Sequence, residues 1–82
     1  MVPIKKKEYV GFGRAVRQFR KGIGISQEDL AIRANIHRTY IGGIERGERN
    51  PTLIMIFRLA AALEVSPHEL LKKSEGYLHA QA

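Results

Sequence analysis

The side chains that most often carry catalysis or hold a cofactor do not form a recognisable site in this sequence. His37, His68 and His79 are too far apart for the ligand spacing of a zinc site. Gly11-Phe12-Gly13 begins like a dinucleotide-binding loop, but no strand pattern precedes it and Val16 stands where the motif requires a third glycine. We therefore expect no enzyme activity, no metal and no cofactor.

Basic side chains do indicate a chemistry, because a dense positive surface attracts polyanions. The chain has 14 Lys and Arg against 8 Asp and Glu, which gives a net charge of +6 and a pI of about 10.1. Seven of the basic residues lie between Lys5 and Lys21, where Glu8 is the only acid. This balance favours nucleic acid or an anionic membrane as the partner. The membrane is the weaker alternative, because the arginines of residues 8–21 surround an apolar face that the core needs.

Length and composition describe a single small domain. The chain has 82 residues, of which 44% are hydrophobic and 27% charged, as in ordinary globular proteins. It contains no cysteine, which excludes disulfides and thiolate metal sites. No apolar run approaches the roughly 20 residues of a membrane span, and no hydrophobic stretch follows Lys5–Lys7 as it would in a secretory signal. We expect a cytoplasmic protein that does not associate with membranes.

The apolar spacing predicts helices and no strands, and therefore a compact all-α domain of five helices. Residues 1–7 form a short basic arm, residues 8–73 the domain and residues 74–82 a tail without clear periodicity. The expected helices cover residues 8–21, 27–34, 38–46, 53–63 and 67–73. Ser26, Thr52 and Ser66 each stand where a hydroxyl would cap the start of a helix.

Residues 27–34 and 38–46 have the lengths of a helix-turn-helix. Asn35 suits the left-handed turn between them, and Ile36 would fill the space between the two helices. In that motif the second helix enters the major groove of DNA. Gly42 and Gly43 would cost this helix about 1 kcal/mol each. Close approach to another helix or to DNA would compensate, and the alternative is that tertiary packing simply tolerates them.

Three stretches of the chain carry a resemblance to a known family. They are Ser26–Ala31, Ile36–Ile41 and Gly43–Thr52. Their sequence resembles the Xre-type family of phage-repressor-like regulators, and is most similar to the controller proteins of restriction–modification systems. The resemblance extends from about Phe12 to Leu71. It implies a five-helix domain that binds a palindromic operator as a dimer.

The resemblance also implies roles for individual side chains. It places Arg38 and Thr39 at base-reading positions, with Gly42 further along the same helix, because arginine can pair with guanine and the threonine methyl can meet thymine. Other side chains match positions near the DNA backbone: Gln27, His37, Tyr40, Arg46, Arg49, Asn50 and Arg17. Alternatives remain for some of them. His37 can cap its helix, Arg46 can pair with Glu45 or Glu48, and Arg14, Arg17 and Arg20 can simply keep their helix soluble.

Residues 53–63 are more apolar than one core-facing helix requires. Leu53, Ile56, Leu59, Ala60 and Leu63 form the expected inward stripe. Ile54, Phe57 and Ala61 form a second stripe on a neighbouring face. Such a surface usually marks an interaction site, and a homodimer would cover it, together with Tyr77 and Leu78 of the tail. The alternative is that the tail folds back over the stripe within one chain.

These observations predict a sequence-specific regulator of transcription that binds duplex DNA. Its expected partners are double-stranded DNA, a second copy of itself and RNA polymerase at the promoter. A second hypothesis is an antitoxin whose helical body sequesters a toxin and whose DNA binding is secondary. A toxin encoded beside it would favour this alternative, whereas methyltransferase and endonuclease genes would favour a restriction–modification controller.

Overall fold

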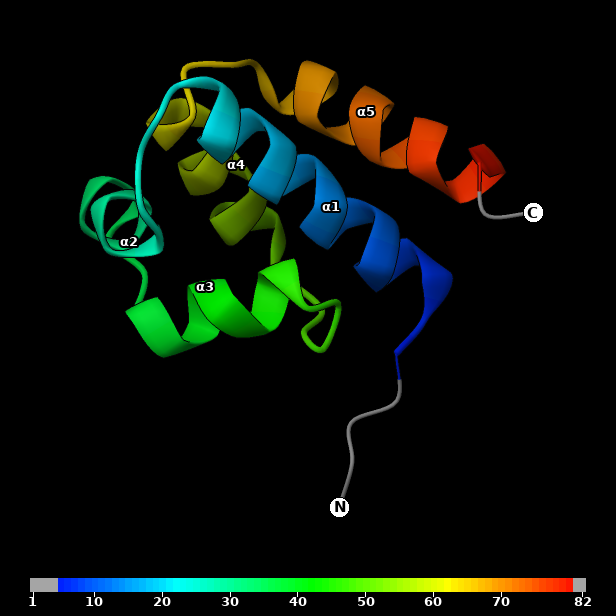
Figure 1. The fold of residues 1–82 in the computed structure, drawn as a ribbon, viewed down its shortest axis with the longest axis horizontal. Coiled ribbons are helices and arrows are strands. Elements are labelled where there is room, and N and C mark those ends of the chain that lie inside the picture. Colours follow the sequence, from blue (N-terminus) through cyan, green and yellow to red (C-terminus); the bar gives the residue numbers. More distant parts are fainter. Residues whose placement is uncertain (1–4, 81–82) are drawn as a thin grey trace.

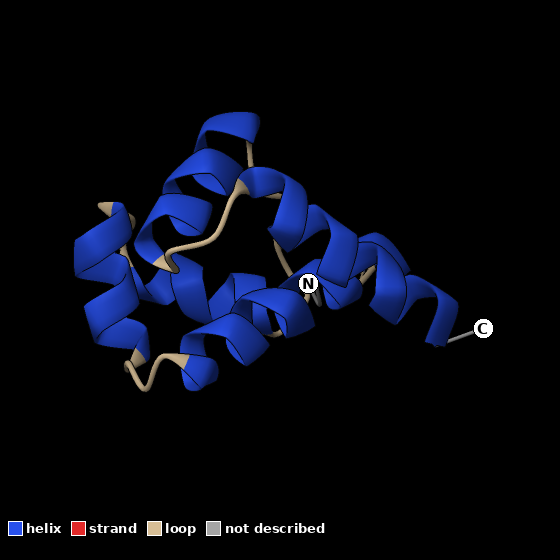
Figure 2. Cartoon of the chain, turned by 90° about the horizontal axis from the view of Figure 1, so that it is seen from above, coloured by secondary structure: helices blue, strands red, loops and turns tan. Residues whose placement is uncertain are grey.

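The computed structural model describes residues 5–80, which fold into five helices joined by short loops (Figures 1 and 2). The helices are α1 (Lys7–Gly22), α2 (Gln27–Ala34), α3 (Arg38–Glu45), α4 (Leu53–Ala62) and α5 (Pro67–Ala80). No strand occurs in this part of the chain. The all-α architecture expected from the apolar spacing is confirmed. Residues 1–4 of the predicted arm lie outside the described residues.

Hydroxyl caps start three of the helices, as predicted. Ser26 Oγ accepts from the amide of Asp29, and the Asp29 carboxylate accepts in return from the Ser26 amide at 3.2 Å. The same reciprocal pair joins Ser66 and Glu69, while Thr52 caps α4. Hydrogen bonds from the backbone amide of Ser26, and then from its hydroxyl, hold the pKa of Asp29 below its usual value. Ser66 lowers the pKa of Glu69 in the same way.

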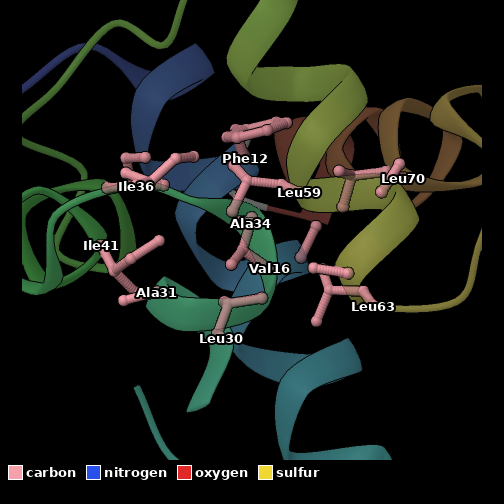
Figure 3. Close-up of a cluster of buried hydrophobic side chains, with 14 residues drawn as sticks. Phe12, Val16, Leu30, Ala31, Ala34, Ile36, Ile41, Leu59, Leu63 and Leu70 are labelled. Carbon is pink, nitrogen blue, oxygen red and sulfur yellow. The ribbon is translucent and has the colours of Figure 1, made fainter. Parts of the chain in front are cut away.

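The core lies where the five helices converge (Figure 3). Its fully buried larger side chains come from every helix: Val16, Leu30, Ile41, Ile44, Leu59, Leu63 and Leu70. The apolar side chains of one face of each helix of the pair α2 and α3 are buried: Leu30, Ala31 and Ala34, and Ile41 and Ile44. Ile36 is also buried and fills the corner between these two helices. This shared core holds α3 at a fixed orientation on the rest of the domain.

Two glycines of α1 allow neighbouring helices to approach closely. A Cβ at Gly13 would lie 2.2 Å from the carbonyl oxygen of Ile44 in α3, closer than any side chain permits. A Cβ at Gly11 would lie 3.0 Å from the carbonyl oxygen of Ser74 in α5. The segment Gly11-Phe12-Gly13, which imitates a nucleotide loop in sequence, is therefore a helix surface against which two other helices pack.

The predicted end of the last helix is wrong, because α5 continues to Ala80 and not only to Lys73. The added turns pack on α1 across the upper part of Figure 1. Ser74 is buried, and the guanidinium of Arg14 lies 4.3 Å from the centre of the Tyr77 ring. Contacts with α1 thus support helical turns whose own apolar periodicity is weak.

Leu53 was expected in the core-facing stripe of α4, but its side chain is 68% exposed. It is the first residue of α4, at the edge of the core-facing arc, where no other helix covers it. Leu59, Ala60 and Leu63 are buried as predicted, and Ile56 is half-buried against the core. Leu53 therefore joins Ile54 and Phe57 on the exposed side of the helix.

Candidate nucleic-acid interface

The turn between α2 and α3 has the geometry of a helix-turn-helix. Asn35 ends α2 in the left-handed conformation with φ of 54°, as its residue type predicted. Ala31 of α2 is buried in the core to which both helices contribute. His37 Nδ1 accepts from the amide of Thr39 at 3.1 Å, which makes His37 the cap of α3. Of the roles open to His37 in sequence, capping is the one that the structure shows.

The first turn of α3 presents two exposed side chains, Arg38 and Thr39. The only acidic group near the Arg38 guanidinium among the described residues is Glu28, whose Oε1 lies 3.9 Å from Arg38 Nε. Both side chains of this pair are more than half exposed, so it is weak and easily broken. Arg38 therefore remains able to donate two parallel hydrogen bonds to a base edge.

Gly42 and Gly43 lie closest to arginine side chains. A Cβ at Gly42 would lie 3.0 Å from Arg46 Nη1, and a Cβ at Gly43 would lie 2.9 Å from Arg49 Cγ. The two arginines thus lie across the backbone of α3. Of the two compensations expected for this costly pair, approach of another helix is seen only at Gly42, whose added Cβ would lie 3.8 Å from Gln27 Oε1 in α2. The glycines also provide room for cationic side chains beside the first turn.

The loop after α3 holds further polar groups next to these arginines. Arg49 lies over the Tyr40 ring, with 5.2 Å between its Cζ and the ring centre, and the Tyr40 hydroxyl approaches the carbonyl oxygen of Asn50 at 3.5 Å. Arg46 forms an ion pair with Glu48 at 3.2 Å, which is one of the alternatives that the sequence left open. The Arg46 side chain is still 58% exposed. Its guanidinium can exchange Glu48 for a phosphate.

A buried ion pair fixes the relation between α1, α2 and α3. Arg20 donates from Nε and Nη2 to the two carboxylate oxygens of Glu45 at 2.7 and 2.9 Å, and from Nη1 to the carbonyl oxygen of Ile25. Gln27 Nε2 donates to the same carboxylate at 3.0 Å. The hydrogen bond with Glu45 raises the pKa of Arg20. The interpretation of Arg20 as a solubilising charge is therefore wrong.

The same network includes Gln27, which the sequence placed near the DNA backbone. Its side-chain nitrogen donates a hydrogen bond to Glu45. Its Oε1 points toward α3 and would lie 3.8 Å from a Cβ placed on Gly42. Gln27 is half-buried at the first position of α2, next to the start of the motif. Sequence analysis missed the Arg20–Glu45 pair because the two residues are 25 positions apart. The one available signal was that each partner is a charged residue next to the apolar positions of its helix.

The remaining predicted site residues are Arg17, expected near the DNA backbone, and the five residues expected at a dimer interface. Arg17 is exposed on α1. Ile54, Phe57 and Ala61 are exposed on α4, whereas Tyr77 and Leu78 are half-buried. Tyr77 packs on the core cluster, and Leu78 lines a surface cavity together with Tyr9 and Ile56. The alternative that residues 74–80 cover the second stripe is wrong, since Ile54 and Phe57 keep 64% and 55% of their surface exposed.

The role of the second glycine can be tested by Gly43→Ala. Alanine favours the helix by about 1 kcal/mol, so the free energy of unfolding should stay constant or rise. Its methyl group would displace Arg49, so affinity for every DNA sequence should fall about five- to twenty-fold through loss of a charge-assisted contact. Gly76→Ala on α5 is the matched control, because nothing lies within 4 Å of its added Cβ. If Gly43→Ala leaves DNA affinity unchanged, the placement of Arg49 over Gly43 does not contribute to DNA binding.

Comparison with known proteins decides the family. Residues 16–70 match the helix-turn-helix family, and this region includes all of α2, α3 and α4. The chain belongs to the Xre-type helix-turn-helix family. This is a family of DNA-binding transcriptional regulators and not a known class of enzyme. The match confirms the resemblance carried by the motif residues.

Several members similar to this Xre-type chain are restriction–modification controllers. Control protein C.BamHI of Bacillus amyloliquefaciens is 49% identical over 61 residues, which cover 73% of this chain and 75% of that protein. The controller C.AhdI from Aeromonas hydrophila is 45% identical with a TM-score of 0.77, over 79% of this chain and 98% of that structure. The C.Esp1396I tetramer, solved with its 35-base-pair operator, is 31% identical with a TM-score of 0.82, over 90% and 97% of the two chains.

No helix between residues 5 and 80 combines the length and the apolar character required to cross a membrane.

Proposed function

We propose that this regulator binds a palindromic operator in duplex DNA as a homodimer and controls the genes of a restriction–modification system, its own gene included. The observation that carries the proposal is the first turn of α3, where the Arg38 and Thr39 side chains are exposed beside the arginines that lie over Gly42 and Gly43. The similarity to several controller proteins supports the restriction–modification context. The site of action would be the cytoplasm, with RNA polymerase as a further partner at the promoter.

The side chains divide by what they can recognise. Arg38 and Thr39 lie at the exposed helix start that enters the major groove, so they would read bases, with the bare backbone of Gly42 allowing close approach. A second set would contact phosphates and set the register of the protein on the duplex. That set contains Gln27, His37, Tyr40, Arg46, Arg49, Asn50 and Arg17. His37 and Gln27 are already engaged in protein hydrogen bonds, so the arginines would supply most of the charge.

The exposed apolar side of α4 supports a dimer. Leu53, Ile54 and Phe57 expose 68%, 64% and 55% of their surface and share one side of the helix with Ala61. A lone domain gains nothing by placing these side chains in water, whereas a second copy would bury them. The domain measures 32 × 30 × 22 Å, so two copies placed side by side fit recognition helices separated by one DNA turn of about 34–36 Å.

Selection of bound duplexes from a random DNA pool tests the function directly. The selected sites should be palindromic, with half-sites centred about 10 base pairs apart. Binding should weaken steeply with salt: the logarithm of the binding constant should fall with the logarithm of salt concentration with a slope near −7 if the phosphate-contacting residues named above meet on the order of 8 phosphates per dimer. A pool without a preferred sequence, combined with tight binding of a neighbouring gene's toxin, would instead support the antitoxin hypothesis.

Substitution of two arginines separates reading from positioning. Arg38→Ala should cost about 1–3 kcal/mol on the selected site and relax the preference at one base pair per half-site. Arg49→Ala should weaken all sequences nearly equally, because phosphate contacts carry no sequence information. Repeating the selection with each variant measures both effects. An Arg38→Ala protein that discriminates as well as the parent would show that another residue reads the bases.

A further inference from the structure

Three consecutive lysines, Lys5, Lys6 and Lys7, stand where the chain enters α1, and all three side chains are exposed. They do not help the helix that they precede. Positive charge is unfavourable at a helix N-terminus, and Lys6, the N-cap residue, makes no side-chain capping hydrogen bond. None of the ion pairs found within residues 5–80 uses any of the three. Local stability therefore does not explain why three cations occupy these positions.

The fold places this lysine run beside the loop that follows α3, the second helix of the helix-turn-helix. A Cβ at Gly47, just after α3, would lie 2.8 Å from Val10 Cγ2, so the first turns of α1 pack directly on the loop that follows α3. Tyr9 also lines one surface cavity with Asn50 and Pro51 of that loop. In Figure 1 the chain enters α1 from the lower side of the molecule, where α3 lies, whereas α5 runs along the upper side.

We propose that Lys5, Lys6 and Lys7 form a second phosphate-binding element, which contacts the DNA backbone beyond the end of α3. The proposal rests on the DNA-binding function proposed above. Arg49 and Asn50 in the loop after α3 would hold the backbone at the edge of the groove read by Arg38. The lysine run stands at the start of α1, whose first turns pack on this loop. Flexible ammonium groups suit phosphates, so this element adds affinity and salt dependence without selecting a sequence.

The test compares two variants that lose the same three charges in different places. One combines Lys5→Gln, Lys6→Gln and Lys7→Gln. The control combines Lys21→Gln, Lys72→Gln and Lys73→Gln, at the far end of α1 and on α5. Affinity of each for the selected operator duplex is measured over a range of salt concentrations. Each lost phosphate contact should reduce the log–log slope by about 0.9, so the first variant should lose about 2.7 per subunit.

The control should change the slope by less than about 1, because its lysines contact no phosphate. Affinity of the Lys5–Lys7 variant should fall roughly ten- to a hundred-fold at low salt, with the base preference unchanged. Ethylation interference should show that the outermost required phosphates of the wild-type site no longer matter to this variant. A wild-type slope in the Lys5–Lys7 variant, or equal losses in both variants, would overturn the proposal.

Circular dichroism checks that the fold survives these changes. The melting temperature of the Lys5–Lys7 variant should not fall, because cations are removed from the positive end of a helix. Should the Lys7 change disturb α1, the double variant of Lys5 and Lys6, which precede the helix, should still lose about 1.8 in slope per subunit. Failure of the wild-type protein to prefer any duplex would refute the proposed function itself. Normal operator binding with an unchanged slope would refute only the lysine element.

Discussion

Replacing Arg20 by methionine should reduce the free energy of unfolding by about 3–5 kcal/mol, because it leaves the Glu45 carboxylate buried without its cation. The two side chains are only 11% and 3% exposed, and Arg20 supplies two of the hydrogen bonds that Glu45 accepts. A domain of this size has about 4–12 kcal/mol of stability in total, so the variant should be close to unfolding at 37 °C. Urea denaturation followed by circular dichroism measures the loss.

Arg33→Met is the matched control for the Arg20 experiment. Arg33 pairs with Glu64 at 3.4 Å, but these side chains are 45% and 69% exposed, so this change should cost less than about 1 kcal/mol. Changing Arg20 and Glu45 together to methionine should recover most of the stability, since a buried pair can be replaced by apolar groups without large cost. A loss at Arg20 no larger than that at Arg33 would show that the pair is solvated in solution.

Replacing Phe57 by glutamate should convert the proposed dimer into a folded monomer. If Phe57 is buried on both sides of a two-fold interface, its loss removes about 3–6 kcal/mol per dimer, or on the order of a hundred- to ten-thousand-fold in the dissociation constant. The new carboxylate would also lie close to its symmetry mate. Operator affinity should fall although this side chain does not touch DNA, because dimerisation and DNA binding are linked by mass action. Sedimentation at micromolar concentration measures the change.

The exposure of Phe57 predicts that the monomer stays folded, which helical circular dichroism would confirm. Ile32→Glu provides the control, since Ile32 is 80% exposed and belongs to α2 and not to the apolar stripe of α4. This variant should remain a dimer. If Phe57→Glu also remains a dimer, the subunit contact lies on another surface, and α5, where Leu71 is 46% exposed, is the next one to test. Unfolding of the Phe57→Glu protein would assign that side chain to the core.

The helix starts and the motif could be read from the sequence because local interactions determine them. Ser26 and Ser66 cap with carboxylates three residues away, and Asn35 takes the left-handed turn that its side chain tolerates. The exposed position of Arg38 follows from its place directly after that turn. Apolar periodicity likewise predicted helices and no strands, since the 3.6-residue repeat is a property of each helix by itself.

Contacts between segments that are distant in sequence determine the features that the sequence did not reveal. Arg20 resembles the other arginines of α1 until α3 brings Glu45 to it, and Gly13 resembles a loop glycine until Ile44 approaches. The last turns of α5 form because they pack on α1, and Leu53 is exposed because no helix covers the start of α4. By itself the sequence determined the all-α class, the helix starts and the recognition motif. Tertiary structure alone determined which charges are buried and which apolar side chains remain in water, because burial depends on partners that are close only in space.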